Sequence, residues 1–326
     1  MVKTVQRVLS VVVTLAIIVV GIAFLGHLVR PVNTDIAIDA IDTFHNMPDN
    51  SFEVIGYGSS HMWRGMNPIE LYNQYGIGAY NYGCNWQKLN TTLLFLKDSL
   101  RTQSPKVVLI ETYLVDDYKN DQNVDGEIYY TTVIDEFDGK REYLKQALGN
   151  DKERYLAYYM PLCAFHDNWI DISKKSFEAA VNNDFYKTMG FVSSEKVTPV
   201  VIPEKNTFNQ NSLSDESIAI LDEIVEICDE ANIDIIFYTT PWQGDYNYSK
   251  AMEEYVLDKN NCVYIDLYEK IEEIGLDGTT DFSDEGHLNT SGSNKVADYL
   301  GEYLIGHYEL TDFRDYENNI WIESQK

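Results

Sequence analysis

Two short motifs that lie far apart in the chain carry the residues best suited to chemistry. The sequence Gly-Ser-Ser-His occupies positions 58–61, and Asp-Glu-Gly-His occupies positions 284–287. A serine becomes a nucleophile when an imidazole removes its proton, and a carboxylate orients and stabilises that imidazole. We therefore expect Ser60 to act as a nucleophile, His287 as its base and Asp284 as the group that orients His287.

The first motif leaves two alternatives open. Ser59 could replace Ser60 as the nucleophile, because the two serines are adjacent. His61 is an alternative base, but the side chain that follows Ser60 in sequence usually points away from it. The second motif is better placed, because a spacing of three residues with an intervening glycine allows a sharp turn. Such a turn brings the side chains of Asp284 and His287 to the same side.

Acyl transfer also requires hydrogen-bond donors for the charge that develops on the carbonyl oxygen. The backbone N–H groups of Ser60 and Gly83 are the candidates, because both residues are expected on loops that follow strands. The side chain of Asn85 is a third candidate, and its alternative role is that of a turn residue.

The elements that must position these groups follow from the alternation of apolar runs and helical periodicity. Strands are predicted over residues 52–56, 79–82, 107–110, 233–238 and 263–267. Helices are predicted from residue 68 onward and over residues 89–100, 215–231 and 291–305. This alternation predicts a three-layer α/β/α fold around a five-stranded, mainly parallel sheet. Sites in such sheets lie beyond the carboxyl ends of the strands, so we expect Ser60, Gly83 and His287 to meet there.

The amino-terminal segment indicates a membrane anchor. Lys3 and Arg7 precede an apolar run without charges over residues 8–29, and about 20 such residues cross a bilayer core. Basic residues before the run predict a cytoplasmic N-terminus and an extracellular remainder. We therefore expect a single-pass protein of the cell membrane whose anchor occupies residues 1–30.

The remaining chain is predicted to divide into a few segments. Residues 31–50 form a stalk or entry helix, residues 51–310 form the α/β domain, and residues 311–326 form a C-terminal tail. The strand and helix periodicity is lost over residues 116–212, apart from a helical stretch around residues 141–159. We interpret that region as an insertion or cap.

Composition excludes some classes of partner. The formal net charge is −27, from 52 acidic and 25 basic residues, and such a surface repels nucleic acid phosphates. The four cysteines contain no Cys-x-x-Cys pair, and the six histidines show no metal-ligand spacing. We therefore expect no nucleic acid partner, no metal site and no cofactor.

Several aromatic side chains are candidates for binding substrate. The set comprises His61, Trp63, Trp86, Trp242, His166 and Trp169. Indole rings stack on sugar faces, but tryptophan also commonly fills protein cores. His166 and Trp169 belong to the insertion, where a packed pair is an equally good interpretation.

These motifs resemble those of the SGNH/GDSL hydrolase superfamily. The first block of that family corresponds to Gly58-Ser59-Ser60, the glycine of its second block to Gly83, and its last block to Asp284 and His287. The resemblance covers residues from about 50 to 115 and from 213 to 305. The third block, usually Gly-x-Asn-Asp, is replaced by Glu-Thr-Tyr-Leu at positions 111–114. The asparagine that supplies an oxyanion donor in the family is therefore missing.

The first and third blocks are more similar to the membrane-anchored branch that modifies bacterial surface polymers. This branch includes polysaccharide O-acetyltransferases and the D-alanyl transfer protein of teichoic acid synthesis. The resemblance implies a serine esterase or acyltransferase that acts on a cell-surface polysaccharide beside a membrane-bound O-acyltransferase. Water as acceptor would make it a hydrolase, and a sugar hydroxyl would make it a transferase. A non-catalytic accessory subunit of such a system is the alternative that the missing asparagine favours.

Overall fold

The computed structural model describes residues 2–29, 36–117, 130–149, 151–159, 161–179, 187–205, 208–316 and 320–321. The chain forms two compact units. Unit 1 comprises Met1–Ile38 and Ile128–Asn183, and unit 2 comprises Asp39–Glu127 and Asp184–Lys326.

A parallel sheet forms the centre of unit 2. Its strands are β1 (Val54–Tyr57), β2 (Ala79–Asn81), β3 (Val107–Glu111), β4 (Asp234–Thr239) and β5 (Cys262–Asp266). They are arranged in the order β2-β1-β3-β4-β5, and every pairing is parallel. All residues of β1 and β3 are buried, as expected of inner parallel strands, and apart from Glu111 at the end of β3 these strands carry no charged residue. The predicted five-stranded parallel sheet is thus confirmed.

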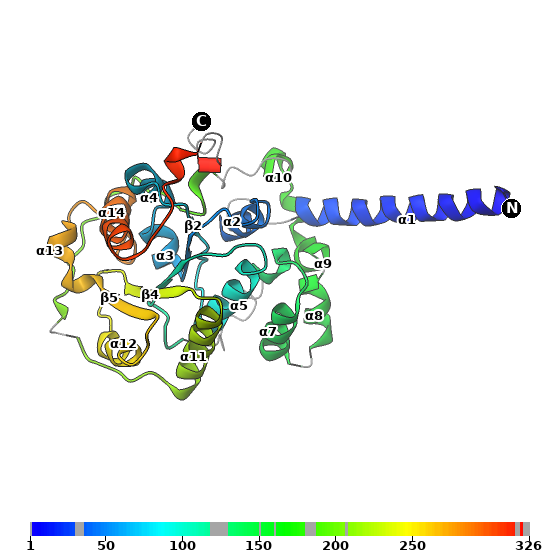
Figure 1. Ribbon diagram of the computed structural model, residues 1–326. Coiled ribbons are helices and arrows are strands. Elements are labelled where there is room, and N and C mark those ends of the chain that lie inside the picture. The colour runs from blue at the N-terminus through cyan, green and yellow to red at the C-terminus, as the bar shows by residue number, and fades with distance from the viewer. Residues whose placement is uncertain are drawn as a thin grey trace. The chain divides into compact units, whose positions relative to one another are not determined.

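Helices connect these strands in unit 2, and two more follow the last strand (Figure 1). They are α3 (Ser60–Gly65), α4 (Pro68–Tyr75), α5 (Leu89–Ser99), α11 (Asp215–Glu230), α12 (Ser249–Val256), α13 (Ile271–Ile274) and α14 (Thr290–His307). Helix α4 contacts α14, and α5 contacts α11. The side chain of Asn67 caps α4, whose first residue is a proline, and both features favour a helix start there. Three short helices, α3, α12 and α13, have no counterpart in the predicted elements.

Helix α2 (Ile36–His45) lies within the predicted stalk. Its Phe44 side chain is buried and stacks on Tyr82, with ring centroids 4.2 Å apart. His45 Nε2 lies 2.7 Å from Asp98 Oδ2, and Asp98 belongs to α5. The C-terminal half of α2 is therefore part of the core of unit 2.

The predicted C-terminal tail also contributes to packing. A 3₁₀ turn, η6 (Phe313–Asp315), contacts the chain near Gly78, and Trp321 is fully buried. The Trp321 ring stacks on Tyr72 of α4, with centroids 5.4 Å apart. The end of the chain thus covers α4 with an aromatic side chain.

Unit 1 is helical in its described part. It contains α1 (Val2–Leu28), η1 (Thr131–Val133), α7 (Asp138–Leu148), α8 (Lys152–Tyr159), α9 (Pro161–Phe165), η2 (His166–Asp171) and α10 (Lys174–Ala179). Within α1, Lys3–Gly26 is long and apolar enough to cross a membrane, with a mean hydropathy of 3.0. The helical stretch predicted around residues 141–159 is two helices, because α7 ends at Gly149, whose φ of +58° does not continue a helix.

Candidate active site

Ser60 is presented by the turn between β1 and α3. Gly58 has a φ of +150°, and a Cβ atom there would lie 2.9 Å from Cβ of Glu111, so this turn requires glycine. Ser59 caps α3, because its Oγ accepts a hydrogen bond from His61 N. Ser59 is also only 2% exposed. Of the two adjacent serines, Ser60 therefore has the hydroxyl that is available for chemistry.

Asp284 and His287 lie on a tight turn that ends just before α14. The turn is closed by an antiparallel bridge between Phe282 and Leu288 and by a 2.9 Å hydrogen bond from Ser283 N to His287 O. Oδ1 of Asp284 accepts a second bond, 2.9 Å long, from the N–H of Gly286. The turn holds both side chains on one side, as the spacing of the motif predicts.

The three predicted catalytic side chains form a continuous hydrogen-bonded chain. His287 Nδ1 lies 2.7 Å from Asp284 Oδ1, and His287 Nε2 lies 2.8 Å from Ser60 Oγ. With a proton on Nδ1, His287 donates to Asp284 and accepts from the Ser60 hydroxyl. This is the arrangement of nucleophile, base and orienting group that serine catalysis requires.

The charge of Asp284 is favoured by its surroundings. Burial alone would raise the pKa of this carboxyl. The hydrogen bond from Gly286 N–H and the adjacent His287 have a larger opposite effect, so the pKa is lowered overall. The guanidinium of Arg64 acts in the same direction. Asp284 is therefore an anion at neutral pH and can stabilise an imidazolium on His287.

His61 has a different environment from His287, although the two rings lie only 5.5 Å apart. The His61 ring stacks on Tyr113 with centroids 3.9 Å apart, and it meets Trp242 edge-on. Burial, followed by the neighbouring His287, lowers the pKa of His61 to about 3. A neutral imidazole of such low basicity is a poor general base, so the geometry favours His287 for that role.

Glu111 and Tyr113 lie at the carboxyl end of β3, where the sequence departs from the third block of the resemblance. Glu111 ends β3, is 4% exposed, and accepts hydrogen bonds from Tyr113 N at 3.1 Å and Thr240 N at 3.3 Å. Burial raises the pKa of Glu111 to about 8. From the sequence alone, these positions were only a departure from the third block of the resemblance. Their contact with the candidate site was not predicted.

The predicted oxyanion donors differ in their availability. Ser60 is the first residue of α3, so its N–H has no carbonyl partner within the helix. The N–H of Gly83 instead donates to Oδ1 of Asn81 at 3.3 Å. Asn85 is half-buried in the loop that follows β2. Ser60 N–H is the best placed of these donors to bind an oxyanion.

The structure brings only some of the predicted substrate-binding residues next to the triad. His61 lies beside His287, Trp242 meets the His61 ring edge-on, and Trp63 is part of α3. Trp86 is 55% exposed and has a φ of +55°. His166 and Trp169 belong to η2 of unit 1.

The segment over residues 187–200 begins with a 3₁₀ turn, continues without regular structure, and bonds to elements around the candidate site. Its backbone hydrogen-bonds to Asn81 of β2, Trp63 of α3, Phe282 and Thr290 of α14. Gly190, with a φ of +83°, is required because a Cβ there would lie 2.0 Å from the carbonyl oxygen of Asn81. The segment has no strand or helix periodicity, so its position beside the candidate site could not be predicted from the sequence.

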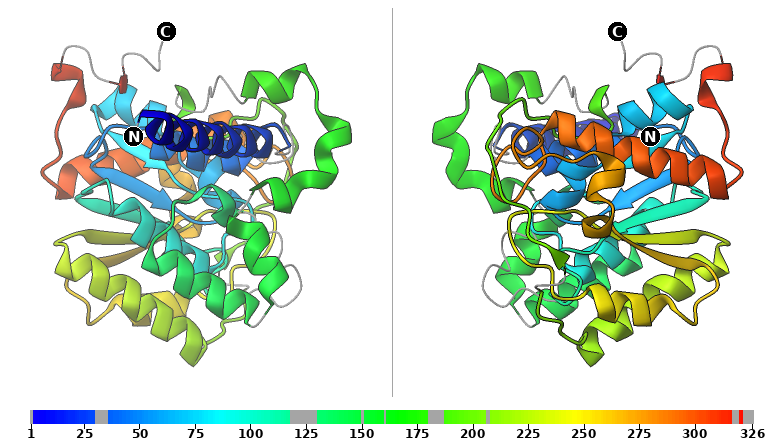
Figure 2. Two further views of the ribbon diagram at one scale, coloured as in Figure 1. Left: turned by 90° about the vertical axis from the view of Figure 1, so that its right-hand side faces the viewer. Right: turned by 90° about the vertical axis from the view of Figure 1, so that its left-hand side faces the viewer.

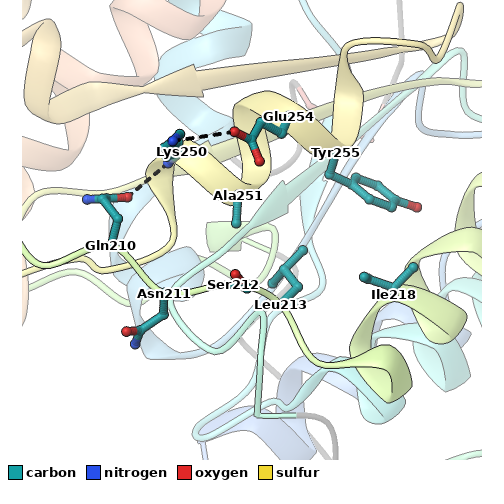
Figure 3. Close-up of a pocket in the computed structure, with 9 residues that line it drawn as sticks. All are labelled: Gln210, Asn211, Ser212, Leu213, Ile218, Lys250, Ala251, Glu254 and Tyr255. Atoms are coloured by element: carbon teal, nitrogen blue, oxygen red, sulfur yellow. Dashed lines mark hydrogen bonds and ion pairs between the residues drawn. The ribbon is translucent and has the colours of Figure 1, made fainter.

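A pocket of about 400 Å³ lies between the start of α11 and α12 (Figure 3). Its walls include Leu213, Ile218, Lys250 and Tyr255, and no residue of the triad lines it. Among the described residues, no group of three or more His, Cys, Asp or Glu side chains is arranged to hold a metal ion.

Comparison of the sequence with protein-family models and with curated proteins found no match. The geometry around Ser60 is therefore the basis for a functional assignment.

Proposed function

We propose that this protein is a serine acyl-esterase or acyltransferase that acts on a cell-surface polysaccharide. The observation that carries the proposal is the hydrogen-bonded chain from Ser60 Oγ through His287 to Asp284. A structural serine would not need an imidazole at 2.8 Å that is itself fixed by a carboxylate.

The proposed mechanism uses each group of the chain in turn. Ser60 Oγ attacks the carbonyl carbon of an acyl ester while its proton passes to His287 Nε2. Asp284 stabilises the imidazolium, and the Ser60 N–H stabilises the oxyanion. His287 then gives its proton to the leaving alcohol, and an acyl-enzyme remains. Water or a sugar hydroxyl attacks the acyl-enzyme while His287 again accepts the proton. The bond between Ser60 Oγ and the acyl group then breaks, and His287 returns the proton to Ser60 Oγ.

The architecture supports a relationship to the SGNH/GDSL superfamily. Ser60, Gly83 and His287 follow β1, β2 and β5 in the positions that the family's blocks would occupy. In Figure 2, α11 and α14 lie on opposite sides of the strands, which supports a three-layer α/β/α domain. Membership of this superfamily remains our proposal.

Location outside the cell is supported by the charges around α1. Lys3 and Arg7 precede the apolar segment, and basic residues favour the cytoplasmic side of a membrane. We propose that α1 anchors the protein and that unit 2 faces outward. A polysaccharide substrate and a membrane-bound O-acyltransferase partner agree with that placement.

A non-catalytic accessory subunit is the second candidate, because two observations favour it. Asparagine is absent from the end of β3, where Glu111 and Tyr113 stand, and the Gly83 N–H is already bonded to Asn81. A site of this kind has fewer oxyanion donors than the related enzymes, and each such donor is worth about 10²–10³-fold in kcat.

Labelling with a fluorophosphonate distinguishes the two candidates. The full chain in detergent micelles is treated with the probe, and the adduct is located by peptide mapping. We expect one adduct on Ser60, which is lost in Ser60→Ala and in His287→Ala because the nucleophile or its base is removed. Glu285→Gln is the matched control, because this exposed residue lies between Asp284 and His287 without joining the chain.

The result decides the assignment. An unlabelled but folded wild-type chain would contradict an activated Ser60 and favour the accessory role. If Ser60 is labelled, a p-nitrophenyl acyl ester is then added with and without an oligosaccharide. Comparison of the products distinguishes hydrolysis from transfer to the sugar.

A further inference from the structure

The residues of α1 are exposed along most of the helix and become buried at its C-terminal end. Within the apolar segment Lys3–Gly26, no residue of the most apolar stretch is buried in the structure. Leu28 and Val29, which follow directly, are only 5% and 4% exposed. The end of α1 is therefore packed against protein, whereas its apolar segment is not.

The covering elements belong to unit 1. Helices α9 and α10 contact α1 near its C-terminal end (Figure 1). The side-chain amide of Asn168, in η2, donates a 3.1 Å hydrogen bond to the carbonyl of Val29. Carbonyls at a helix end need such partners, so Asn168 fixes η2 at the end of α1.

Large apolar side chains are exposed at this position. Trp169 and Ile170 follow Asn168 directly and are 67% and 69% exposed, and Phe177 of α10 is 49% exposed. We name these three residues the juxtamembrane patch. All three lie on elements that contact α1 or the residue that follows it, and exposed apolar groups that are not scattered singly commonly mark a binding surface.

The depth of the patch follows from helix geometry. Val29 lies three residues beyond Gly26, which corresponds to about 4.5 Å along a helix axis. The headgroup region on each side of a bilayer is roughly 5–7 Å thick. If Lys3–Gly26 spans the hydrocarbon core, the residues bonded to Val29 lie at headgroup depth, where tryptophan is enriched in membrane proteins.

We propose that the juxtamembrane patch inserts into the headgroup region of the bilayer that α1 spans. The binding is apolar rather than electrostatic, because the exposed carboxylates of Asp167 and Asp171 flank Trp169 and Ile170. Zwitterionic lipid therefore suffices. The proposal rests on α1 as the anchor and is independent of catalysis at Ser60.

Spin labels on the full chain in phosphatidylcholine vesicles test the proposal. Cys163 is the exposed native thiol, so Cys163→Ser provides a background whose other cysteines are buried. Single labels are then placed at Ile170→Cys, at Ile18→Cys within α1, and at Leu257→Cys, an apolar residue of unit 2 that is 78% exposed. Power saturation compares the accessibility of each label to oxygen, which concentrates in lipid, and to a water-soluble nickel chelate.

We expect the oxygen-to-nickel ratio at position 170 to lie between those at positions 18 and 257, and to exceed the latter several-fold. A ratio at 170 equal to that at 257 would overturn the proposal, because the patch would then face water. Spin–spin broadening at 170 would overturn it in favour of a second copy of the chain. Loss of access to both reagents would overturn it, because position 170 would then be buried within protein. A label at position 18 that faces water would also overturn it, because α1 would then not be the anchor.

Discussion

Two histidines that lie 5.5 Å apart have opposite environments at the candidate site. His287 is bonded to a carboxylate on one side and to the Ser60 hydroxyl on the other, so it can take up a proton and share the charge. His61 is enclosed by Tyr113 and Trp242, and no carboxylate is hydrogen-bonded to it in the described structure. Hydrogen-bond partners rather than distance from Ser60 thus favour His287 over His61 as the candidate base.

Glu111 is a second residue whose protonation is set by burial. Its pKa is about 8 in the folded protein and near the ordinary 4.5 in the unfolded chain, so the folded state binds the proton more tightly. Its contribution to the free energy of unfolding is therefore complete below pH 4.5 and is lost as the pH rises toward 8.

Glu111→Gln should flatten the dependence of stability on pH. The wild-type contribution that disappears between these pH values is at most about 5 kcal/mol, from the shift in pKa. We expect Tm to fall more steeply between pH 5 and pH 8 in the wild type than in the variant. Glu285→Gln, which alters an exposed glutamate between Asp284 and His287, serves as the control and should follow the wild type. Parallel curves for wild type and Glu111→Gln would show that Glu111 is ionised in the folded protein.

At the scale of elements, the short helix α3 depends on side chains from other elements. The amide of Asn81, at the end of β2, donates 2.8 Å hydrogen bonds to the carbonyls of Met62 and Met66. The hydroxyl of Ser293 from α14 bonds the carbonyl of Arg64. A helix of six residues is too short to be stable alone, so these contacts hold Ser60 in place.

Asn81→Ala should loosen α3. The substitution removes the Asn81 donor from both carbonyls, although Met62 O keeps a bond from Met66 N. A buried group that is left unsatisfied costs about 1–3 kcal/mol. We expect a lower Tm and slower fluorophosphonate labelling of Ser60, measured side by side. Asn46→Ala is the matched control, because Asn46 also donates to a carbonyl but at an exposed position, and it should change neither quantity. An unchanged labelling rate at reduced Tm would show that Asn81 stabilises the fold without positioning Ser60.

At the scale of the whole molecule, the protein combines an apolar N-terminal helix, α1, with a strongly acidic overall composition. The net charge of −27 keeps the chain soluble in water, whereas Lys3–Gly26 exposes a continuous apolar surface. These properties agree with an anchored protein whose larger unit lies in an aqueous compartment.

Charges placed within α1 should abolish anchoring. Each lysine near the centre of a membrane helix costs about 2.5–3.5 kcal/mol of insertion free energy. We expect Val12→Lys combined with Ile18→Lys to move the chain from the carbonate-resistant membrane fraction to the soluble fraction. Val201→Lys is the control, because Val201 is 78% exposed in unit 2. Equal fractionation of all three proteins would exclude α1 as the anchor.

Local pattern was sufficient to predict much of the fold. Inner strands such as β3 are covered on both faces, so they appear in the sequence as continuous apolar runs with β-branched residues. Parallel strands end at a common edge, so Ser60 and His287 could be expected to meet although 227 positions separate them. Helix α3 was not predicted, because six residues carry too little periodicity for that.

The sequence by itself determined the apolar segment at the N-terminus and the parallel sheet, and it predicted that Ser60, Asp284 and His287 would meet, because each depends on local composition or on strand order. Only the tertiary structure decided that Ser59 is a cap, that His61 is neutral, that Glu111 holds its proton and that Asn81 supports α3. These properties depend on burial and on hydrogen bonds between residues remote in sequence, and neither is encoded in any local pattern.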